Sequence, residues 1–440
     1  MINKTLIFVD RLTEDAHQLP LSFLKVGGLT ILERQLRQLK KVGISQVYLV
    51  SDRLQDMAKA EVGKFKGGPE SIQIIKDISE GDEHWGEHES LFIIEEGRMV
   101  DQRIMRAVIN SSMPNVLSFF NEDALLVGIS KAKKVTIEDK DLIFASVLRI
   151  RGDILKRSSL DKEFLSSPIL SLLGNFESGM GFDKIKAIDI KKYVPNLRRN
   201  LDVLWRPIEK ASDCNKITKL LISRAQKGTQ DAISRWVYPI PENFLTEHLL
   251  KTPLQGMVLR GLIFLFGVYL TWLFAIGHMG WGLAGVIILG IFFGVEEKSS
   301  QILLQERSKI KISANIFKVV EYSWMFAIAF YMAKMTGNQA LWAVGLLIIL
   351  FDIIMGLQKS FYRRISGHSL DDAGSFEKSF KLLGAMRNTR VWLLIPFALI
   401  EKWELGFWVI AIYTVGSFFT IQYRFFKRLV EKLSPSETQP

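Results

Sequence analysis

The sequence predicts two domains of different class, an α/β domain followed by an all-α domain of six membrane-spanning helices. Short apolar runs and an amphipathic helix alternate in the N-terminal half, an order typical of a sheet with crossover helices. Long apolar segments begin only after residue 255. The mean hydropathy of +0.16 is intermediate between soluble and membrane proteins, as expected if the 440 residues combine one domain of each kind.

The net charge of +11 is carried largely by Lys and Arg residues next to the apolar segments. This placement favours membrane lipids as partners over nucleic acid, which we do not expect to bind. Cys214 is the only cysteine, which excludes an intrachain disulfide and fits a reducing cytoplasm. The first residues, MINKTLIFVDRLTED, contain too short an apolar run for a signal peptide, so we expect the α/β domain to stay in the cytoplasm.

The α/β domain is predicted to cover residues 1–205. Thr5–Val9 is expected to be a buried strand, Ile31–Val42 an amphipathic helix that ends at Gly43, and Val47–Val50 the next strand. This order indicates a parallel sheet. Three further apolar runs are predicted to extend the sheet, namely Ser90–Ile94, Asn115–Phe119 and Leu142–Val147.

The loop after the first strand is where such folds bind phosphate, usually with glycine-rich backbone. Here the loop has no glycine before Gly27 and carries Asp10, Glu14 and Asp15. These acids would repel a triphosphate, so an ordinary surface loop is favoured over a nucleotide site. A second turn, at Gly97, has Glu95, Glu96 and Asp101 nearby but also Arg98 within the turn itself.

Residues 206–255 are predicted to be a linker that ends in a juxtamembrane helix. Pro239 and Pro241 are expected to break the linker, and Asn243–Leu250 to form an amphipathic helix at the membrane surface. The basic stretch Lys184–Arg199 before it fits equally well against lipid headgroups or on a solvated face.

The membrane domain is predicted to cover residues 256–430, with a flexible tail over 431–440. Several of its apolar segments approach the ~20 residues that span a bilayer. The fifth segment is short, so its helix is expected to begin near Phe380 and to carry Arg387 and Arg390. Asp352, in the fourth, is expected to turn toward a basic neighbour. The six segments are Val258–Gly277, Trp281–Val295, Val319–Ala333, Ala340–Leu357, Val391–Ile400 and Leu405–Tyr423.

Charge asymmetry between the loops predicts the orientation. The loops Lys298–Lys318 and Lys359–Arg390 and the C-terminal tail are rich in Lys and Arg, whereas the alternate loops are not. The positive-inside rule therefore predicts an integral inner (cytoplasmic) membrane protein with both termini in the cytoplasm. Glu296, Glu297 and Glu321 would then lie near membrane depth, where acids usually mark a functional site.

Four stretches resemble parts of a known fusion. PLSFLKVGGLTILERQLRQLKKVGISQVYLV and EEGRMVDQRIM are similar to the first helix and the metal turn of Rossmann-like sugar nucleotidyltransferases. KGTQDAISRWVYPIPENFLTEHLLKTP and MRNTRVWLLIPFALIEKWELGFWVIAIYTVGSFF resemble the juxtamembrane helix and last two helices of the CDP-alcohol phosphotransferase (CDP-alcohol phosphatidyltransferase) family. The resemblance implies a nucleotidyltransferase-like domain fused to a membrane domain of that family.

The signature of the membrane family is D-x2-D-G-x2-A-R-x8-G-x3-D-x3-D. Aligned with it, Glu296 takes the position of the first Asp and Glu321 that of the last. If the chain is active, the resemblance implies that these two glutamates hold Mg²⁺ or Mn²⁺ and that Glu321 acts as the base. The substrate would then contact Ser299, Ser300 and Arg307; otherwise no cofactor is expected. The remaining signature positions hold Leu303, Leu304, Ser313 and Phe317.

The signature is degenerate, because a serine and a phenylalanine replace two metal-binding carboxylates, and hard cations need oxygen ligands. The first domain departs similarly, with DRLTED for the glycine-rich loop, Leu19 for a lysine and Arg98 for the metal Asp. Three hypotheses remain: a catalytically degenerate scaffold or regulatory partner in phospholipid head-group synthesis, an active CDP-alcohol phosphotransferase, and a lipid-binding or transport protein.

The alternative for Glu296 and Glu321 is simple pairing with a basic neighbour such as Lys298 or Lys318. Expected protein partners are a second copy of the chain, as in a homodimer, and an active paralogue or another lipid-synthesis enzyme. The sequence does not indicate which alcohol or lipid is involved.

Overall fold

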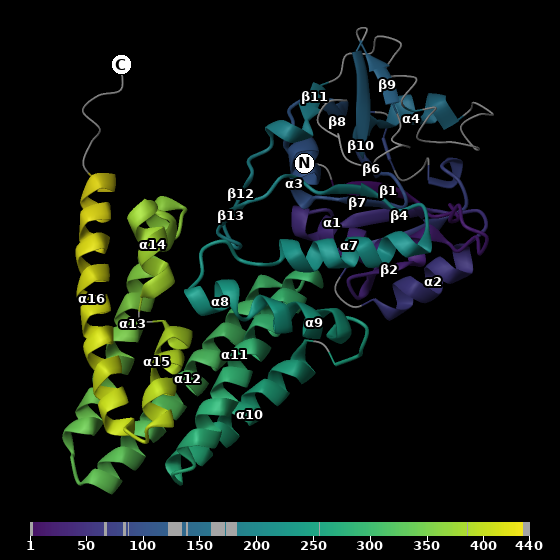
Figure 1. The fold of residues 1–440 in the computed structure, drawn as a ribbon. Helices are drawn as coiled ribbons and strands as arrows, with labels where there is room; N and C mark the ends of the chain where they lie inside the picture. Colours follow the sequence, from purple (N-terminus) through teal and green to yellow (C-terminus); the bar gives the residue numbers. More distant parts are fainter. Residues whose placement is uncertain are drawn as a thin grey trace. The chain divides into compact units, whose positions relative to one another are not determined.

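A computed structural model describes residues 3–65, 68–81, 85–86, 88–121, 134–137, 140–159, 172, 183–254, 256–384 and 386–433. The chain forms two compact units (Figure 1). Unit 1 comprises Met1–Lys192 and Leu201–Leu221, and unit 2 comprises Tyr193–Asn200 and Ile222–Pro440.

Unit 1 is built on one sheet with the strand order β11-β8-β10-β6-β1-β4-β5, to which β9 adds by pairing with β10. Strands β1, β4, β5 and β6 are parallel, and β11 is parallel to β8. The sheet is mixed rather than parallel as predicted, because β10 runs antiparallel to both β6 and β8. The strands are β1 (Lys4–Phe8), β4 (Gln46–Val50), β5 (Ser71–Ile75), β6 (Ser90–Ile94), β8 (Val116–Asn121), β9 (Lys134–Ile137), β10 (Lys140–Arg151) and β11 (Asp183–Lys186).

The helix predicted at Ile31–Val42 is α1, with the same bounds. Its first turn is capped by Thr30, whose hydroxyl accepts a hydrogen bond from the backbone N–H of Glu33 at 3.0 Å. It ends at Gly43, which takes a φ of +93° that favours glycine. Its apolar side chains recur at helical spacing and lie buried against the sheet.

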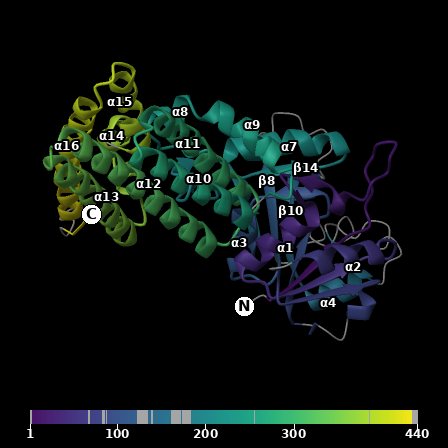
Figure 2. The ribbon, with the colours of Figure 1, turned by 90° about the horizontal axis from the view of Figure 1, so that it is seen from below.

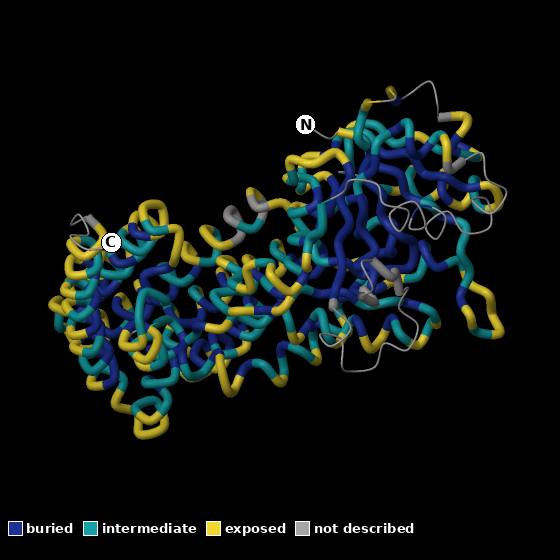
Figure 3. The backbone as a smooth tube through the Cα atoms, turned by 90° about the horizontal axis from the view of Figure 1, so that it is seen from above, coloured by how far each residue is buried: buried dark blue, intermediate teal, exposed yellow. Residues whose placement is uncertain are grey.

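The rest of unit 1 surrounds this sheet, and Figure 3 shows much of the centre of the unit as buried. The other helices are α2 (Gln55–Lys64), α3 (Gln102–Asn110), α4 (Gly152–Ser159) and α7 (Ala211–Arg224). The short elements are η1 (Leu21–Phe23), β2 (Lys25–Val26), β3 (Leu29–Thr30), η2 (Ser79–Gly81), β7 (Arg98–Val100), η4 (Ala187–Asp189) and β14 (Trp205–Pro207).

Unit 2 is a helical bundle in which α12 packs against α10 and α13, and α16 packs against α13 and α15 (Figure 2). Among the described residues, five helices are long and apolar enough to cross a membrane, as expected of an integral membrane protein. The helices are α8 (Ala232–Trp236), α9 (Pro239–Leu249), α10 (Met257–Ala275), α11 (Met279–Ile302), α12 (Arg307–Thr336), α13 (Ala340–Ser366), α14 (Ser375–Leu383), α15 (Arg387–Leu399) and α16 (Trp403–Leu433).

Two expectations about these helices are corrected. The fifth apolar helix does not begin near Phe380, because α14 ends at Leu383 and α15 begins at Arg387. With 13 residues, α15 is about 20 Å long at ~1.5 Å per residue, less than the ~30 Å hydrocarbon core. Pro239 and Pro241 do not break the chain but lie in the first turn of α9, where a missing N–H costs no helical hydrogen bond.

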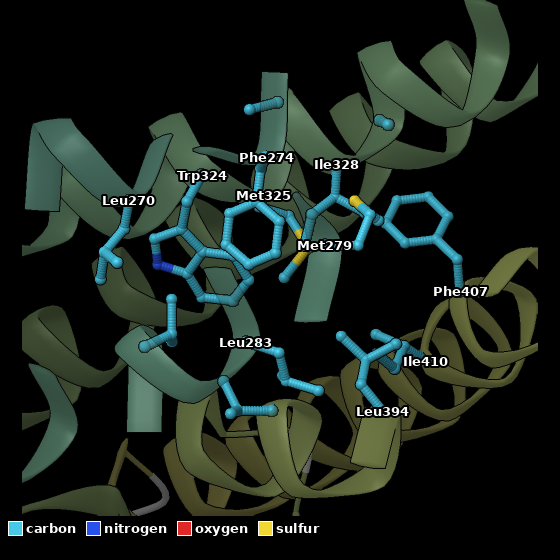
Figure 4. Close-up of a cluster of buried hydrophobic side chains, with 14 of the residues drawn as sticks. Leu270, Phe274, Met279, Leu283, Trp324, Met325, Ile328, Leu394, Phe407 and Ile410 are labelled. Atoms are coloured by element: carbon cyan, nitrogen blue, oxygen red, sulfur yellow. The ribbon is translucent and has the colours of Figure 1, made fainter. Parts of the chain in front are cut away.

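The core of unit 2 is formed by side chains from α10, α11, α12, α13, α15 and α16, some of which are drawn in Figure 4. Trp324, Phe274 and Phe407 are among its largest fully buried side chains. Gly267 allows α10 to approach α12 closely, since a Cβ there would lie 2.2 Å from Val320 Cγ1. Small residues at such contacts are typical of helix packing in membranes.

A hairpin formed by β12 (Tyr193–Val194) and β13 (Arg199–Asn200) belongs to unit 2, although both flanking segments belong to unit 1. The Tyr193 hydroxyl donates to Asp372 Oδ2 at 2.7 Å, and Arg198 Nη1 donates to Asp371 Oδ2 at 2.9 Å. Both acids lie in the short helix η5 (Leu370–Asp372). These two contacts bind the hairpin to η5 within unit 2.

Candidate functional site

A cavity of about 250 Å³ in unit 2 is lined by both glutamates that the signature alignment singles out, Glu296 and Glu321. They come from the last part of α11 and the middle of α12, and the opening residues of α15 complete the wall with residues of α8 and α9. We call this the glutamate cavity. It is lined by Lys227, Gln230, Ser234, Tyr238, Glu242, Gly290, Phe293, Gly294, Glu296, Glu297, Ile310, Ala314, Phe317, Lys318, Glu321, Arg387 and Asn388.

Glu296 is buried and bound by an arginine. Its Oε1 lies 2.7 Å from Nε of Arg260, in the first turn of α10, and accepts a second hydrogen bond from the Ser300 hydroxyl at 2.7 Å. Arg260 Nη2 in turn donates to Ser300 Oγ at 3.0 Å and to Gln305 Oε1. This network neutralises Glu296 and fills the hydrogen-bonding positions of Oε1.

Glu321 is also bound by an arginine. Arg390 Nη2, in α15, lies 3.4 Å from Glu321 Oε1 and also donates to Asp352 Oδ2 of α13. Asp352 therefore does turn toward a basic neighbour, as expected. One guanidinium, only 2% exposed, joins carboxylates from two helices and leaves the three-residue group with one excess negative charge.

The two remaining glutamates of the cavity are paired as well. Glu242 Oε2 lies 2.8 Å from Lys298 Nζ, which also donates to Asn243 Oδ1 at 2.6 Å. Burial raises the pKa of the Glu242 carboxyl, and the adjacent Lys298 ammonium opposes that rise. Glu297 pairs with Lys227. Lys298 and Lys318, the expected partners of Glu296 and Glu321, are thus replaced by Arg260 and Arg390.

The other signature positions have different surroundings. Ser299 donates to the carbonyl oxygens of Val295 and Glu296 in its own helix, at 2.8 and 3.0 Å, and does not line the cavity. Phe317 lines it and packs against Phe293 with ring centroids 4.2 Å apart. Arg307 is the first residue of α12, but its side chain lies outside the described residues.

Two cations of the cavity have no carboxylate partner within the described residues, Lys318 and Arg387. Arg387 Nε donates to Asn388 Oδ1 at 3.0 Å, and its guanidinium lies 4.5 Å from the centroid of the Phe293 ring. Neither side chain forms an ion pair with a described residue, but both lie close enough to Glu321 to interact with its carboxylate electrostatically. Lys318 and Arg387 thus add positive charge to the lining of the cavity.

The side chains present do not fit the divalent metal that the resemblance implies. A hard cation needs several oxygen ligands, ideally charged ones. Glu296 and Glu321 are each occupied by a guanidinium, and the two other acidic positions of the signature hold Ser299 and Phe317. Across the described residues, no three His, Cys, Asp or Glu side chains are grouped as metal ligands.

The acid-rich turn of unit 1 has a similar arrangement. Glu95 Oε1 lies 3.3 Å from Arg98 Nη2 and 3.6 Å from Arg11 Nη1, and its Oε2 accepts from the Ser146 hydroxyl at 2.8 Å. Asp101 does not belong to this cluster. Its side chain caps α3 and pairs with Arg103. The position expected for a metal-binding Asp is thus held by a buried arginine that pairs with the neighbouring acid.

Glu96, the other acid of this turn, is buried and hydrogen-bonded by two neutral donors. Its two carboxylate oxygens accept from the Ser22 hydroxyl at 2.7 Å and from the backbone N–H of Arg11 at 2.8 Å. Burial raises the pKa of Glu96 to about 7, against the effect of these two hydrogen bonds.

Sequence reasoning missed the arginine that binds Glu296. The signal for Arg260 was a lone basic residue at the start of an apolar span. Charges placed there usually pair inside the bundle. Arg390 carried the same signal but had no partner in sequence, because Glu321 and Asp352 lie on two other helices.

Comparison with known proteins gives structural neighbours only. No protein-family model and no curated protein matches the sequence. The inositol-1-phosphate CTP transferase from T. maritima is 15% identical over 48% of this chain and 91% of that one, with a TM-score of 0.35. HddC from Yersinia pseudotuberculosis is 11% identical over 50% of this chain and 99% of that one, with a TM-score of 0.35.

The phosphatidylinositol phosphate synthase from Mycobacterium tuberculosis, solved with CDP-DAG bound, is 16% identical over 47% of this chain and 98% of that one, with a TM-score of 0.36. The neighbours include nucleotidyltransferases and a CDP-alcohol phosphotransferase, the two kinds of protein that the sequence resembles. At these identities and TM-scores they assign no activity to the chain.

Proposed function

We propose that the chain is a CDP-alcohol phosphotransferase-like membrane protein that takes part in phospholipid head-group synthesis without performing metal-dependent transfer itself. It would act as a scaffold or regulatory partner of an active paralogue or another lipid-synthesis enzyme. The observation that carries this proposal is the pairing of both signature glutamates with arginines, Arg260 on Glu296 and Arg390 on Glu321.

The physical reason is electrostatic. An arginine side chain stays protonated at every pH a protein tolerates, so it cannot release its carboxylate by titration. A divalent ion at Glu296 would lie beside the Arg260 guanidinium, and two like unit charges ~4 Å apart repel by about 4 kcal/mol even at a moderate effective dielectric. The repulsion doubles for a doubly charged ion. Metal binding would therefore require the Arg260 guanidinium to move away from Glu296. That movement would leave a charged side chain in the bundle without its partner.

A second candidate function, lipid binding or transport, is supported by the unpaired cations Lys318 and Arg387. Together they could hold a phosphate group in the glutamate cavity without a metal, since a phosphate accepts charge-assisted hydrogen bonds from both kinds of side chain. Such binding is compatible with a scaffold, because a partner enzyme could receive the lipid or be regulated by it.

The membrane orientation and the assembly state belong to the same proposal. The basic loops support a cytoplasmic location for unit 1, both termini and the glutamate cavity. A homodimer is the assembly we expect, and membrane lipids are the expected surroundings.

The test is a transfer assay on the purified full chain with CDP-alcohol donors and lipid acceptors, in Mg²⁺ or Mn²⁺ and in EDTA. The proposal predicts no metal-dependent product. Product that requires the metal and disappears in Glu321→Gln would instead establish an active phosphotransferase. A membrane protein that co-purifies in stoichiometric amount, and is itself active, would support the scaffold role.

A further inference from the structure

The membrane unit has a second and larger cavity, of about 570 Å³, at the opposite ends of the same helices. It is lined by the start of α11, the end of α12, the turn from α15 to α16 and the start of α16. The glutamate cavity is lined instead by the last part of α11, the first half of α12 and the start of α15. Met279 and Glu296, one in each lining, are separated by roughly 25 Å along α11 at ~1.5 Å per residue. The nearest lining residues are closer, since Gly290 and Met279 on α11, and Glu321 and Tyr331 on α12, are roughly 15 Å apart along their helices. The two cavities thus lie at different depths of the bundle.

The walls of this cavity, here called the tryptophan cavity, combine three kinds of surface. Trp403, Trp408 and Tyr331 supply aromatic rings, Glu401 and Glu404 supply carboxylates, and Lys402 supplies one ammonium. The rest of the wall is largely apolar. Its lining residues are Met279, Tyr331, Met332, Met335, Thr336, Glu401, Lys402, Trp403, Glu404, Leu405 and Trp408.

Two unusual backbone positions shape this lining. Gly277 has a φ of +91°, and a Cβ there would lie 2.3 Å from Tyr331 Cζ, so only glycine lets the tyrosine ring take its place. Glu401 takes a φ of +58°, which is uncommon for a residue other than glycine. The backbone N–H of Lys402 donates to the Phe397 carbonyl at 2.8 Å and closes that turn. The side chains of the turn are therefore held at the cavity by a defined backbone.

We propose that the tryptophan cavity binds the headgroup of a phospholipid that carries an ammonium group next to its phosphate. Aromatic faces attract an ammonium through the ring quadrupole, and Glu401 and Glu404 add opposite charge. Lys402 can meet the phosphate, and the methionines can cover the first carbons of the acyl chains. A volume of about 570 Å³ lies in the range typical of small-molecule sites.

Charge decides between this headgroup and an anionic one. The lining carries two carboxylates and one ammonium, so it is negative overall and repels a headgroup with net negative charge. Glu404 is partly engaged, since its Oε1 accepts from Asn338 Nδ2 at 3.1 Å. Glu401 has no such partner within the described part of the chain, and it is the carboxylate best placed to bind a ligand. The inference does not depend on whether the glutamate cavity is catalytic.

The experiment is native mass spectrometry of the full chain in detergent micelles with phosphatidylethanolamine or phosphatidylglycerol of identical acyl chains. We expect the wild-type chain to retain the ethanolamine lipid about fivefold better, the ratio that ~1 kcal/mol of cation–π and carboxylate attraction gives. Glu401→Gln should bring the ratio close to one. The matched control is Lys334→Gln, which removes an exposed charge near the end of α12 outside the cavity lining and should leave the ratio unchanged.

Equal retention of both lipids by the wild-type chain would overturn the proposal and leave only general lipid contact. Unchanged preference in Glu401→Gln would overturn it as well. If that variant unfolds at a lower temperature than the wild-type chain, Trp408→Phe keeps the test open, because it weakens the attraction to an ammonium while it preserves an aromatic ring. A preference that survives in both variants contradicts the assignment.

Discussion

Arg260 Nε lies 2.7 Å from Glu296 Oε1, so the carboxylate at the first signature position is bound to a guanidinium. The same substitution of partners recurs at Glu321, where Arg390 takes this role. In each pair one member, Glu296 or Arg390, is buried and the other is half-buried, and such a pair constrains the fold in a way that a surface pair does not.

Removing Arg260 alone should lower the free energy of unfolding more than removing Arg260 and Glu296 together. Arg260→Gln leaves Glu296 buried and uncompensated, and we expect the free energy of unfolding in mixed micelles to fall by about 3–5 kcal/mol. The double variant Arg260→Gln/Glu296→Gln should recover most of that loss, because neither charge remains. As a control, Lys251→Gln breaks an exposed pair with Glu247, with 3.8 Å between Nζ and Oε1, and should cost less than ~1 kcal/mol. If Arg260→Gln is as stable as the double variant, Arg260 does not compensate the charge of Glu296.

The group around Arg390 should respond asymmetrically. Arg390→Gln leaves both Glu321 and Asp352 without their shared cation, and should destabilise by about 3–5 kcal/mol in the same unfolding assay. Glu321→Gln removes the excess negative charge and leaves a neutral pair, so its effect on stability should be within about 1 kcal/mol. An unfolding free energy for Glu321→Gln as low as that of Arg390→Gln would contradict this account of the charge balance.

Glu96 should make the stability of unit 1 depend on pH. Its pKa is raised from 4.5 to about 7 in the folded chain, so the folded state binds this proton more tightly than the unfolded state. The stabilising contribution is complete below about pH 4.5 and is lost as the pH rises through about 7. The total change is on the order of 3 kcal/mol at 1.36 kcal/mol per pKa unit.

Hydrogen exchange of peptides from β6, corrected for the pH dependence of intrinsic exchange, measures this effect on the full chain. In Glu96→Gln, the protection of β6 against exchange should no longer change between pH 5 and 8. At pH 8 it should be greater than in the wild-type chain. If the pH dependence of β6 protection persists in Glu96→Gln, another group causes it and the assignment to Glu96 is wrong.

Asp371 should hold the hairpin that carries Tyr193 and Arg198. Burial alone would raise the pKa of Asp371, but Lys381, Lys359 and Arg198, at 3.2, 3.0 and 2.9 Å, hold it well below its usual range. Asp371→Asn leaves three cations facing one another, so we expect faster hydrogen exchange and proteolysis in the hairpin. Asp372→Asn, which keeps an acceptor for the Tyr193 hydroxyl, serves as the milder comparison.

Most elements of the fold could be predicted from local patterns in the sequence. The bounds of α1 followed from a capping threonine, apolar spacing and Gly43, which are all encoded within one stretch. The antiparallel direction of β10 could not be predicted, because an apolar run does not indicate which strands it pairs with or in which direction. The break before Arg387 was missed for a related reason. Apolar residues lead up to it, and only Gly384 signalled the end of α14.

The candidate site was only partly readable. Spacing placed Glu296 and Glu321 at corresponding signature positions, and the structure places them along one cavity. Their partners could not be read from spacing, since Arg260 lies 36 positions from Glu296 and Arg390 lies 69 positions from Glu321. Ion pairs between helices depend on which faces meet, and that is decided by packing.

The most direct test of the central claim is Mn²⁺ binding to the purified full chain, followed by electron paramagnetic resonance of the free ion. We expect no saturable binding in the wild-type chain, because guanidinium groups occupy Glu296 and Glu321. Arg260→Gln should gain weak binding if the chain remains folded. Saturable, stoichiometric binding in the wild-type chain that is lost in Glu296→Gln would contradict the account.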